Sequence, residues 1–257
     1  MPETILYEVN NHAAWITLNR PESLNAITAE MNREIKQAVS KASKDPAVRC
    51  LVFTGAGRAF SSGQDLSDVD GEMDHGLVLR EHYGPMIQEI MKCEKPIVAA
   101  VNGVAAGAGF SLALACDFRV ASEKSSFLNA FIHVGLIPDS GNLFFLNRLI
   151  GPAKTLELSL FGEKIPSAFA YEMGIVNQVV SMEKWETGIQ EYIEKIIKLP
   201  PKAVGLIKRS LSYAGTLPLN EYLLKEAENQ RIAGLTEDHH EGVAAFLEKR
   251  KPIFYGK

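Results

Sequence analysis

Residues 97–116 read IVAAVNGVAAGAGFSLALAC, and this stretch decides the fold. The apolar run 97–101 predicts a short buried strand that ends at the turn pair Asn102-Gly103. A helix of small residues is expected from Gly107 to Cys116. A strand, a glycine-rich loop and a helix in this order predict an α/β core in which short parallel strands alternate with helices.

The flanking sequence continues this alternation up to about Ser181. Further strands are expected at 15–18, 50–54 and 118–121, with helices following Thr28, over about 77–91 and over 143–149. Beyond Ser181 the pattern predicts only helices, at about 184–198, 201–213, 218–233 and 236–250. We therefore divide the chain near Pro200 into a core, residues 1–200, and a C-terminal helical region, residues 201–257. The apolar faces of that region must be buried on the core or on another subunit.

The composition is that of an ordinary globular protein: 257 residues, 46% hydrophobic and 23% charged. A net charge of −4 argues against nucleic acid and anionic membranes as partners. Cys50, Cys93 and Cys116 lack metal or disulfide spacing, so we expect no metal and a reducing compartment, the cytoplasm. The N-terminus resembles no signal peptide, and no apolar run is long enough to span a membrane.

One carboxylate, Asp139, stands in a turn between Pro138 and Gly141, after an apolar run and before a helical pattern. Apolar surroundings raise the pKa of a carboxyl group, which suits it to carry protons near neutral pH. An aspartate in front of a helix is also a common N-cap. The catalytic interpretation of Asp139 therefore depends on two other segments.

These segments are loops of small residues that follow predicted strands, at 60–66 and 102–109. Loops at strand ends are where α/β sheets place ligands, and small side chains let a ligand approach backbone N–H groups. One N–H group from each loop could form an oxyanion hole. The alternative is that both loops are tight turns that pack a helix on a strand.

Three other patterns compete with this interpretation. Ser111 stands in a partial nucleophile-elbow pattern, with Asp139 and His239 or His240 as partners, but no strand runs directly into it, so a small residue inside a helix is favoured. The run from Gly55 resembles a dinucleotide fingerprint, but its third glycine is replaced by Phe60. His75 and His82 are expected on a solvated face rather than in a metal site.

Several segments together resemble the crotonase (enoyl-CoA hydratase/isomerase) superfamily, over nearly the whole chain. They are Ile16-Thr17-Leu18-Asn19-Arg20-Pro21, Leu24-Asn25-Ala26, Phe60-Ser61-Ser62-Gly63-Gln64-Asp65-Leu66, Lys95 to Gly103, Gly107-Ala108-Gly109, Ala115-Cys116-Asp117, Gly135-Leu136-Ile137-Pro138 and Glu248 to Pro252. The resemblance implies a spiral of ββα units with a C-terminal helical trimerisation region, assembled as a homotrimer or homohexamer. It implies an acyl-CoA thioester as substrate, no further cofactor, and an oxyanion hole from the N–H groups of Gln64 and Ala108.

The family's hydratases use two glutamates, and this chain has Ser111 and Phe131 at those positions. Adding water requires one group to activate the water and another to deliver a proton. We therefore expect weak hydratase activity. Asp139 stands where several relatives carry aspartate, and the surrounding strings look most like the phenylacetyl-CoA ring-epoxide isomerase branch. Asn142 replaces the second glycine that is usual in this turn.

The resemblance predicts an isomerase in which Asp139 moves a proton while the Gln64 and Ala108 N–H groups hold the enolate. The residues expected to bind the substrate or its CoA are Leu24, Ala26, Ser62, Asp65, Leu66 and Phe131, with the basic C-terminal residues Arg250, Lys251 and Lys257 as further phosphate contacts. An apolar wall for the acyl group is expected from Phe127, Phe131, Phe144 and Phe145. Two alternatives remain: Asp139 as the nucleophile of a hydrolase or dehalogenase, and a catalytically weak acyl-CoA-binding protein.

Overall fold

A six-stranded sheet forms the centre of the computed structural model, which describes residues 4–65 and 73–257. Its strand order is β1-β2-β3-β5-β7-β10. The hairpin β1–β2 is antiparallel, and every later pair in this sheet is parallel. The strands are β1 (Ile5–Asn10), β2 (Ala13–Leu18), β3 (Cys50–Gly55), β5 (Ile97–Val101), β7 (Phe118–Ser122) and β10 (Gln178–Val180).

A second sheet of short strands has the order β4-β6-β8-β9. Its members are β4 (Ala59–Ser61), β6 (Val104–Ala106), β8 (Ser126–Leu128) and the antiparallel β9 (Ile165–Pro166). Each of β3, β5 and β7 is followed by one short strand of this sheet and then by helical residues. The repeated unit is therefore ββα, and the predicted spiral is confirmed, although the short strands themselves were not predicted.

Helices fill the connections of the spiral. Thr28 caps the first of them, as predicted, by accepting a hydrogen bond from the Met31 N–H at 3.2 Å. The predicted helix at 143–149 continues to Phe161 across a kink at Gly151, whose φ is 75°. The helices are α1 (Ala29–Lys44), α2 (His75–Val78), the π-helical η3 (Leu79–Tyr83), α3 (Gly84–Lys92), α4 (Ala108–Ala115), α5 (Asn142–Phe161), α6 (Ser167–Glu172) and α7 (Trp185–Ile197), with 3-10 turns η1 (Pro21–Ser23), η4 (Ala130–Val134) and η5 (Met182–Lys184).

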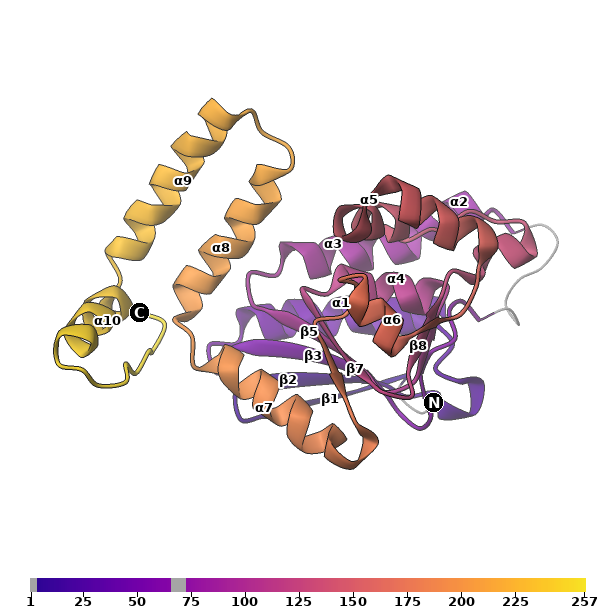
Figure 1. Ribbon diagram of the computed structural model, residues 1–257, viewed down its shortest axis with the longest axis horizontal. Coiled ribbons are helices and arrows are strands. Elements are labelled where there is room, and N and C mark those ends of the chain that lie inside the picture. The colour runs from indigo at the N-terminus through magenta and orange to yellow at the C-terminus, as the bar shows by residue number, and fades with distance from the viewer. Residues whose placement is uncertain (1–3, 66–72) are drawn as a thin grey trace.

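The large sheet is covered on both faces (Figure 1). Helix α7 packs Ile189 and Ile193 on one face, against valines of β3, β5 and β7. Helices α1, α3 and α4 belong to the larger apolar core. Every residue of α4 is buried, as expected of a helix that is apolar all round and lies inside a domain.

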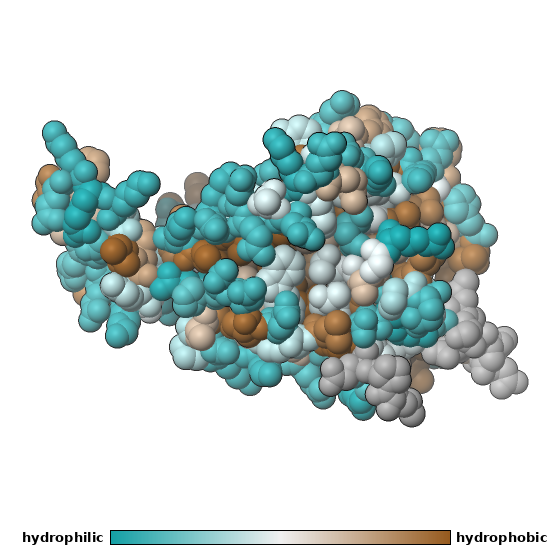
Figure 2. All heavy atoms as spheres, turned by 90° about the horizontal axis from the view of Figure 1, so that it is seen from below, coloured by the Kyte–Doolittle hydropathy of each residue, from teal (hydrophilic) through white to brown (hydrophobic). Residues whose placement is uncertain are grey.

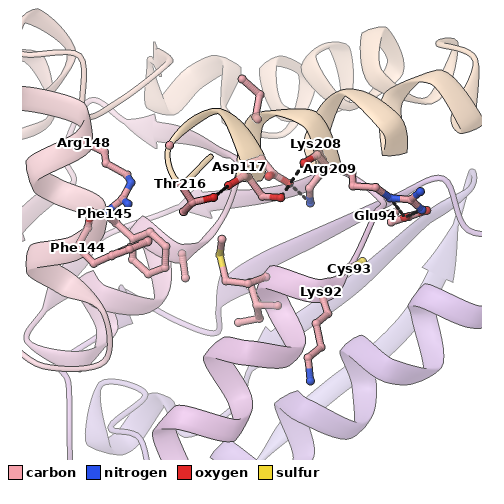
Figure 3. Close-up of a pocket in the computed structure, with 16 residues that line it drawn as sticks. Lys92, Cys93, Glu94, Asp117, Phe144, Phe145, Arg148, Lys208, Arg209 and Thr216 are labelled. Atoms are coloured by element: carbon pink, nitrogen blue, oxygen red, sulfur yellow. Dashed lines mark hydrogen bonds and ion pairs between the residues drawn. The ribbon is translucent and has the colours of Figure 1, made fainter. Parts of the chain in front are cut away.

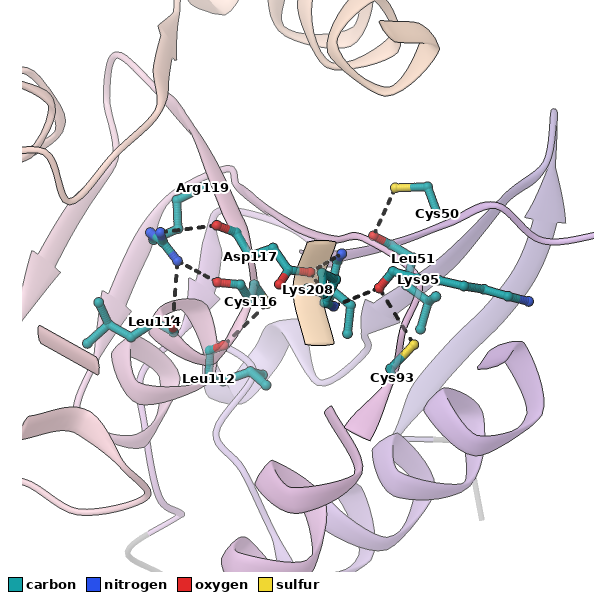
Figure 4. Close-up of polar contacts among 11 residues, drawn as sticks. Cys50, Leu51, Cys93, Lys95, Leu112, Leu114, Cys116, Asp117, Arg119 and Lys208 are labelled. Carbon is teal, nitrogen blue, oxygen red and sulfur yellow. Dashed lines mark hydrogen bonds and ion pairs between the residues drawn. The ribbon is translucent and has the colours of Figure 1, made fainter. Parts of the chain in front are cut away.

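Buried polar side chains fix the far end of α4 (Figure 4). The Arg119 guanidinium is only 3% exposed and donates to the carbonyl oxygens of Cys116 at 2.7 Å and Ile175 at 2.6 Å. Longer bonds reach other carbonyls at the C-terminus of α4, where a cation is favoured. The three cysteines are free and buried, and burial raises the pKa of the Cys116 thiol to about 12.

The last three helices extend away from the core (Figure 1). They are α8 (Pro201–Ala214), α9 (Leu219–Gly234) and α10 (Glu237–Leu247). Lys208 of α8 pairs with Asp117 at 2.6 Å, and the Arg49 guanidinium donates to the Phe254 carbonyl at 2.7 Å. The last predicted helix ends early because Lys249 adopts a left-handed conformation, φ 55°. Among the described residues no helix combines the length and the apolar character needed to cross a bilayer.

Candidate active site

The two small-residue loops meet where β4 and β6 end. Gly63, with φ 99°, lies so close to the other loop that an added Cβ would be 2.9 Å from the Ala106 oxygen and 3.4 Å from the Ala108 nitrogen. Gly107 also has a positive φ, 51°, and directly precedes α4. Both positions favour glycine, since a side chain would be strained there and would separate the loops.

The two segments that approach each other carry the predicted N–H donors, those of Gln64 and Ala108. Gln64 is held in a parallel bridge to Ile27, whose N–H donates to the Gly63 oxygen at 2.7 Å and whose carbonyl accepts from the Asp65 N–H at 3.0 Å. Within residues 4–65 and 73–257, neither the Gln64 nor the Ala108 N–H donates to another group of the chain. Ala108 is also the first residue of α4, where the helix dipole favours negative charge. The pair can therefore act as an oxyanion hole.

Asp139 occupies the first position of a tight turn rather than an N-cap. Ser140 and Gly141 both have positive φ, 54° and 80°. The Asn142 N–H donates to the main-chain carbonyl oxygen of Asp139 at 2.9 Å. These values describe a type I′ turn. Helix α5 starts at Asn142 without any side-chain cap. The carboxylate instead accepts a hydrogen bond from the Ser140 hydroxyl at 2.9 Å.

Asp139 and Gln64 line the same small cavity, of about 80 Å³. The rest of the described lining is His75 and the apolar side chains of Val78, Leu79, Leu136 and Ile137. Burial raises the pKa of the Asp139 carboxyl, and the Ser140 hydrogen bond and the charge of His75 oppose that shift in part. The structure thus brings Asp139 and Gln64, the residue that carries one predicted N–H donor, to a single cavity, together with His75, which was expected on a solvated face.

Ser111 is buried beside Asp139 but lacks the partners of a nucleophile. Its hydroxyl lies 3.0 Å from the Asp139 carbonyl oxygen and 3.2 Å from that of Gly107. His239 and His240 belong to α10, away from α4 (Figure 1). The alternative of a Ser-Asp-His triad is wrong, because the folded chain places both histidines away from Ser111 and Asp139.

The predicted CoA-binding segments lie side by side. Arg20 pairs with Asp65 at 2.7 Å and also donates to the Ala26 oxygen at 2.7 Å. The Ser62 N–H donates to the Leu24 oxygen at 2.9 Å. These four predicted contacts, Leu24, Ala26, Ser62 and Asp65, therefore share one surface next to Gln64. Leu66 lies outside the described residues.

Two buried side chains support this surface, and their role was not anticipated. Asn25 donates to the oxygens of Ala56 and Ala59, each at 2.9 Å. The Ser61 hydroxyl donates to the Asn25 oxygen at 2.8 Å and accepts from the Gly63 N–H at 3.2 Å. In the sequence, the only sign of a role for Asn25 was its place in the family-like motif 24–26.

The predicted wall of four phenylalanines does not form. Phe131 is buried, and its ring tip would lie 3.9 Å from a Cβ at Gly107. Phe127 instead packs on Phe110 in the core, with 5.2 Å between ring centroids. Phe144 is 52% exposed and carries the Arg148 guanidinium over its ring. Phe144, Phe145 and Arg148 line a different cavity, of about 470 Å³, which also contacts α8 (Figure 3).

The side chain of Arg250 and the main chain of the C-terminal tail are held at α10. Arg250 forms ion pairs with Glu241 and Glu248. The N–H groups of Tyr255 and Gly256 donate to the Asp238 carboxylate at 2.7 and 2.8 Å, so the tail packs on α10. Within one subunit, the tail lies beside α10, at the opposite end of the view from α2 (Figure 1).

Comparison with known proteins supports the same assignment of fold. The family model for enoyl-CoA hydratase/isomerase matches residues 8–257. The chain is 39% identical to 1,2-epoxyphenylacetyl-CoA isomerase of Escherichia coli, over all of both chains. It is 36% identical to trans-2-decenoyl-[acyl-carrier-protein] isomerase of Streptococcus mutans, over 98% of both. A solved enoyl-CoA hydratase from Bacillus anthracis superposes with a TM-score of 0.92 at 31% identity, covering 99% of this chain and all of that one. The chain therefore belongs to the enoyl-CoA hydratase/isomerase family and has the crotonase fold.

Proposed function

We propose that this enzyme isomerises unsaturated or aromatic-derived acyl-CoA thioesters, with Asp139 as the proton carrier. The observation that carries the proposal is the shared cavity, in which Asp139 is the one carboxylate among the described lining residues. The names of two relatives, an epoxyphenylacetyl-CoA isomerase and a decenoyl isomerase, point the same way. CoA enters as part of the substrate, and no other cofactor is required.

The chemistry follows from one acid and two N–H donors. Asp139 removes a proton from a carbon next to the unsaturated system, and negative charge moves onto the thioester oxygen. The Gln64 and Ala108 N–H groups stabilise that charge, and losing one such donor typically costs about 3 kcal/mol. The same carboxyl group then returns the proton to another carbon, so the double bond moves.

Hydration lacks the two carboxylates that the family's hydratases use. The family's two glutamate positions hold Ser111, whose hydroxyl is bonded inside the protein, and Phe131, which cannot carry a proton. A buried neutral hydroxyl cannot replace a carboxylate in activating water at neutral pH. We therefore expect isomerisation to exceed hydration.

The test is to incubate the protein with a panel of 2-enoyl-, 3-enoyl- and ring-modified acyl-CoAs in deuterated water. We expect the double bond to migrate, and Asp139→Asn to reduce that rate by about 100-fold or more. Glu194→Gln, which changes a surface carboxylate on α7, should leave the rate unchanged. Dominant formation of 3-hydroxyacyl-CoA, or an unchanged rate in Asp139→Asn, would contradict the proposal.

A second candidate uses Asp139 as a nucleophile. His75 lines the same cavity, and an imidazole near an ester of Asp139 could activate water for its hydrolysis. A hydrolase of this kind would expel CoA and form a mixed anhydride on Asp139, whereas a dehalogenase would expel halide and form an ester of Asp139. Either adduct is detectable by mass spectrometry after rapid acid quenching. A catalytically weak acyl-CoA-binding protein would instead bind the panel without turning any member over.

We further propose that the protein assembles as a homotrimer or homohexamer through its C-terminal region. Leu219, Leu224 and Phe246 are 72%, 68% and 82% exposed in the single chain. Hydrophobic residues also lie at the surface between that region and the body of the molecule (Figure 2). Native mass spectrometry should find three or six copies, and a monomer at micromolar concentration would contradict this.

The three unpaired cysteines favour a cytoplasmic location.

A further inference from the structure

Ser111 connects the acid-bearing turn to the helix that supplies an N–H donor. It lies in the first turn of α4, three residues after Ala108, and its side chain is fully buried. A hydroxyl inside an apolar helix is costly unless it is hydrogen-bonded. Here it lies 3.0 Å from the Asp139 carbonyl oxygen, to which it can donate.

Asn142 completes this arrangement from the other side of the turn. Its side-chain amide donates to the Ser111 hydroxyl at 3.3 Å, and its main-chain N–H donates to the Asp139 oxygen at 2.9 Å. The Asn142 N–H bond, which closes the turn, and the Ser111 hydroxyl bond, which joins the turn to α4, therefore share one acceptor, the carbonyl oxygen of Asp139. The residue that replaces the family's usual glycine thus takes part in holding the turn.

We infer that Ser111 and Asn142 are positioning residues that set the distance between the Asp139 carboxylate and the Ala108 N–H group. This rests on the proposed function, in which those two groups act on one substrate. Neither side chain lines the cavity of Asp139 and Gln64, so both act through Asp139 rather than on the substrate. Misplacing a reacting group by about 1 Å can reduce a rate by about 100-fold.

The test compares Ser111→Ala, which removes the hydroxyl, with Ser111→Thr, which keeps it. We expect Ser111→Ala to lower kcat about 10- to 100-fold with KM within about threefold, and Ser111→Thr to recover most of the loss. Asn142→Ala should show the same kcat-specific loss. The double variant should be no slower than the slower single variant, because both changes release the same turn.

A second measurement needs no turnover. The Asp139 carboxyl is titrated by ¹³C NMR in the intact oligomer and assigned by its absence in Asp139→Asn. In Ser111→Ala and in Asn142→Ala the released turn exposes the carboxyl, so its titration midpoint should move down toward that of a solvated aspartate. If Ser111→Ala fails to fold, the Asn142→Ala variant alone tests the inference, because Asn142 lies at the start of a different helix, α5.

The outcomes separate this inference from the proposed function. Wild-type kcat and an unchanged titration in both alanine variants would overturn the inference, as would equal losses in Ser111→Ala and Ser111→Thr. If the wild type turns over no member of the panel, the isomerase proposal fails, and the titration alone decides the positioning role. A lowered midpoint in both alanine variants would then still support it.

Discussion

Replacing Gly109 with alanine should disable the site without deleting any of the proposed functional groups, because it displaces one of them. Gly109 lies in the first turn of α4, next to Ala108. A Cβ there would lie 2.6 Å from the Ser61 Cβ and 2.7 Å from the Ser61 carbonyl oxygen. Ordinary van der Waals contact begins at about 3.4 Å, so the helix or Ser61 must move by roughly 0.8 Å.

Ser61 is the less able of the two to move. It belongs to β4, and its hydroxyl is bonded to the Asn25 oxygen and to the Gly63 N–H. The first turn of α4 must therefore retreat and take the Ala108 N–H with it. Donors of an oxyanion hole act at 2.7–3.1 Å, so a shift of this size removes most of one donor's effect, about 100-fold in kcat. Overpacking should also lower the free energy of unfolding by about 1–3 kcal/mol.

The assay is the isomerisation rate with the best substrate of the panel, measured on variants of verified oligomeric state. The matched control is Gly234→Ala, since Gly234 is also helical and an added Cβ there meets nothing within 4 Å. We expect wild-type kcat for the control. A folded Gly109→Ala variant with kcat within threefold of wild type would refute the reasoning about the donor.

Three further predictions concern stability. Arg119→Met should lower the free energy of unfolding by about 3–5 kcal/mol, since it leaves buried carbonyls unpaired. The surface control Arg33→Met should lower it by less than about 0.5 kcal/mol. Denaturant unfolding at fixed protein concentration measures both, and a loss under about 1 kcal/mol for Arg119→Met would contradict the first. Because burial raises the pKa of Asp139, wild-type stability should fall as pH rises from the ordinary aspartate pKa through the raised one, and Asp139→Asn should be more stable above that window. Thermal unfolding between pH 4 and 8 checks this, and equal pH dependence would contradict it. Tyr83→Phe should change the free energy of unfolding by no more than about 1 kcal/mol, since among the described residues its buried hydroxyl has no partner at regular hydrogen-bond geometry and only a weaker contact with the Asn32 side chain. A larger loss would contradict this.

The strands and helices that carry a local signal were predictable from sequence. The run 97–101 is apolar and ends in Asn-Gly, and the structure has β5 at Ile97–Val101. The strands β4, β6, β8 and β9 have only two or three residues each. Such segments are too short to show a period, and they are strands only because distant segments pair with them.

The site residues likewise divide into those with a local sequence signal and those that depend on contacts between distant segments. Glycine-rich loops and the turn at Asp139 have local signatures, so they could be identified as candidates. The contact of Ser111 with Asp139 and the place of His75 in the cavity join segments far apart in the chain. Phe144 shows the opposite case. It lies near the Asp139 turn in sequence and was therefore expected at the acyl site, but its position on α5 directs its ring into another cavity.

The N–H pair at Gln64 and Ala108 belongs to the main chain, and this has an evolutionary consequence. Every amino acid except proline carries such a group, so point mutations can alter the surrounding side chains without deleting either donor. A duplicated gene would inherit both N–H groups of the proposed oxyanion hole. New reactions could then arise by relocating a single acid, so chemistry on this scaffold can diverge faster than its architecture.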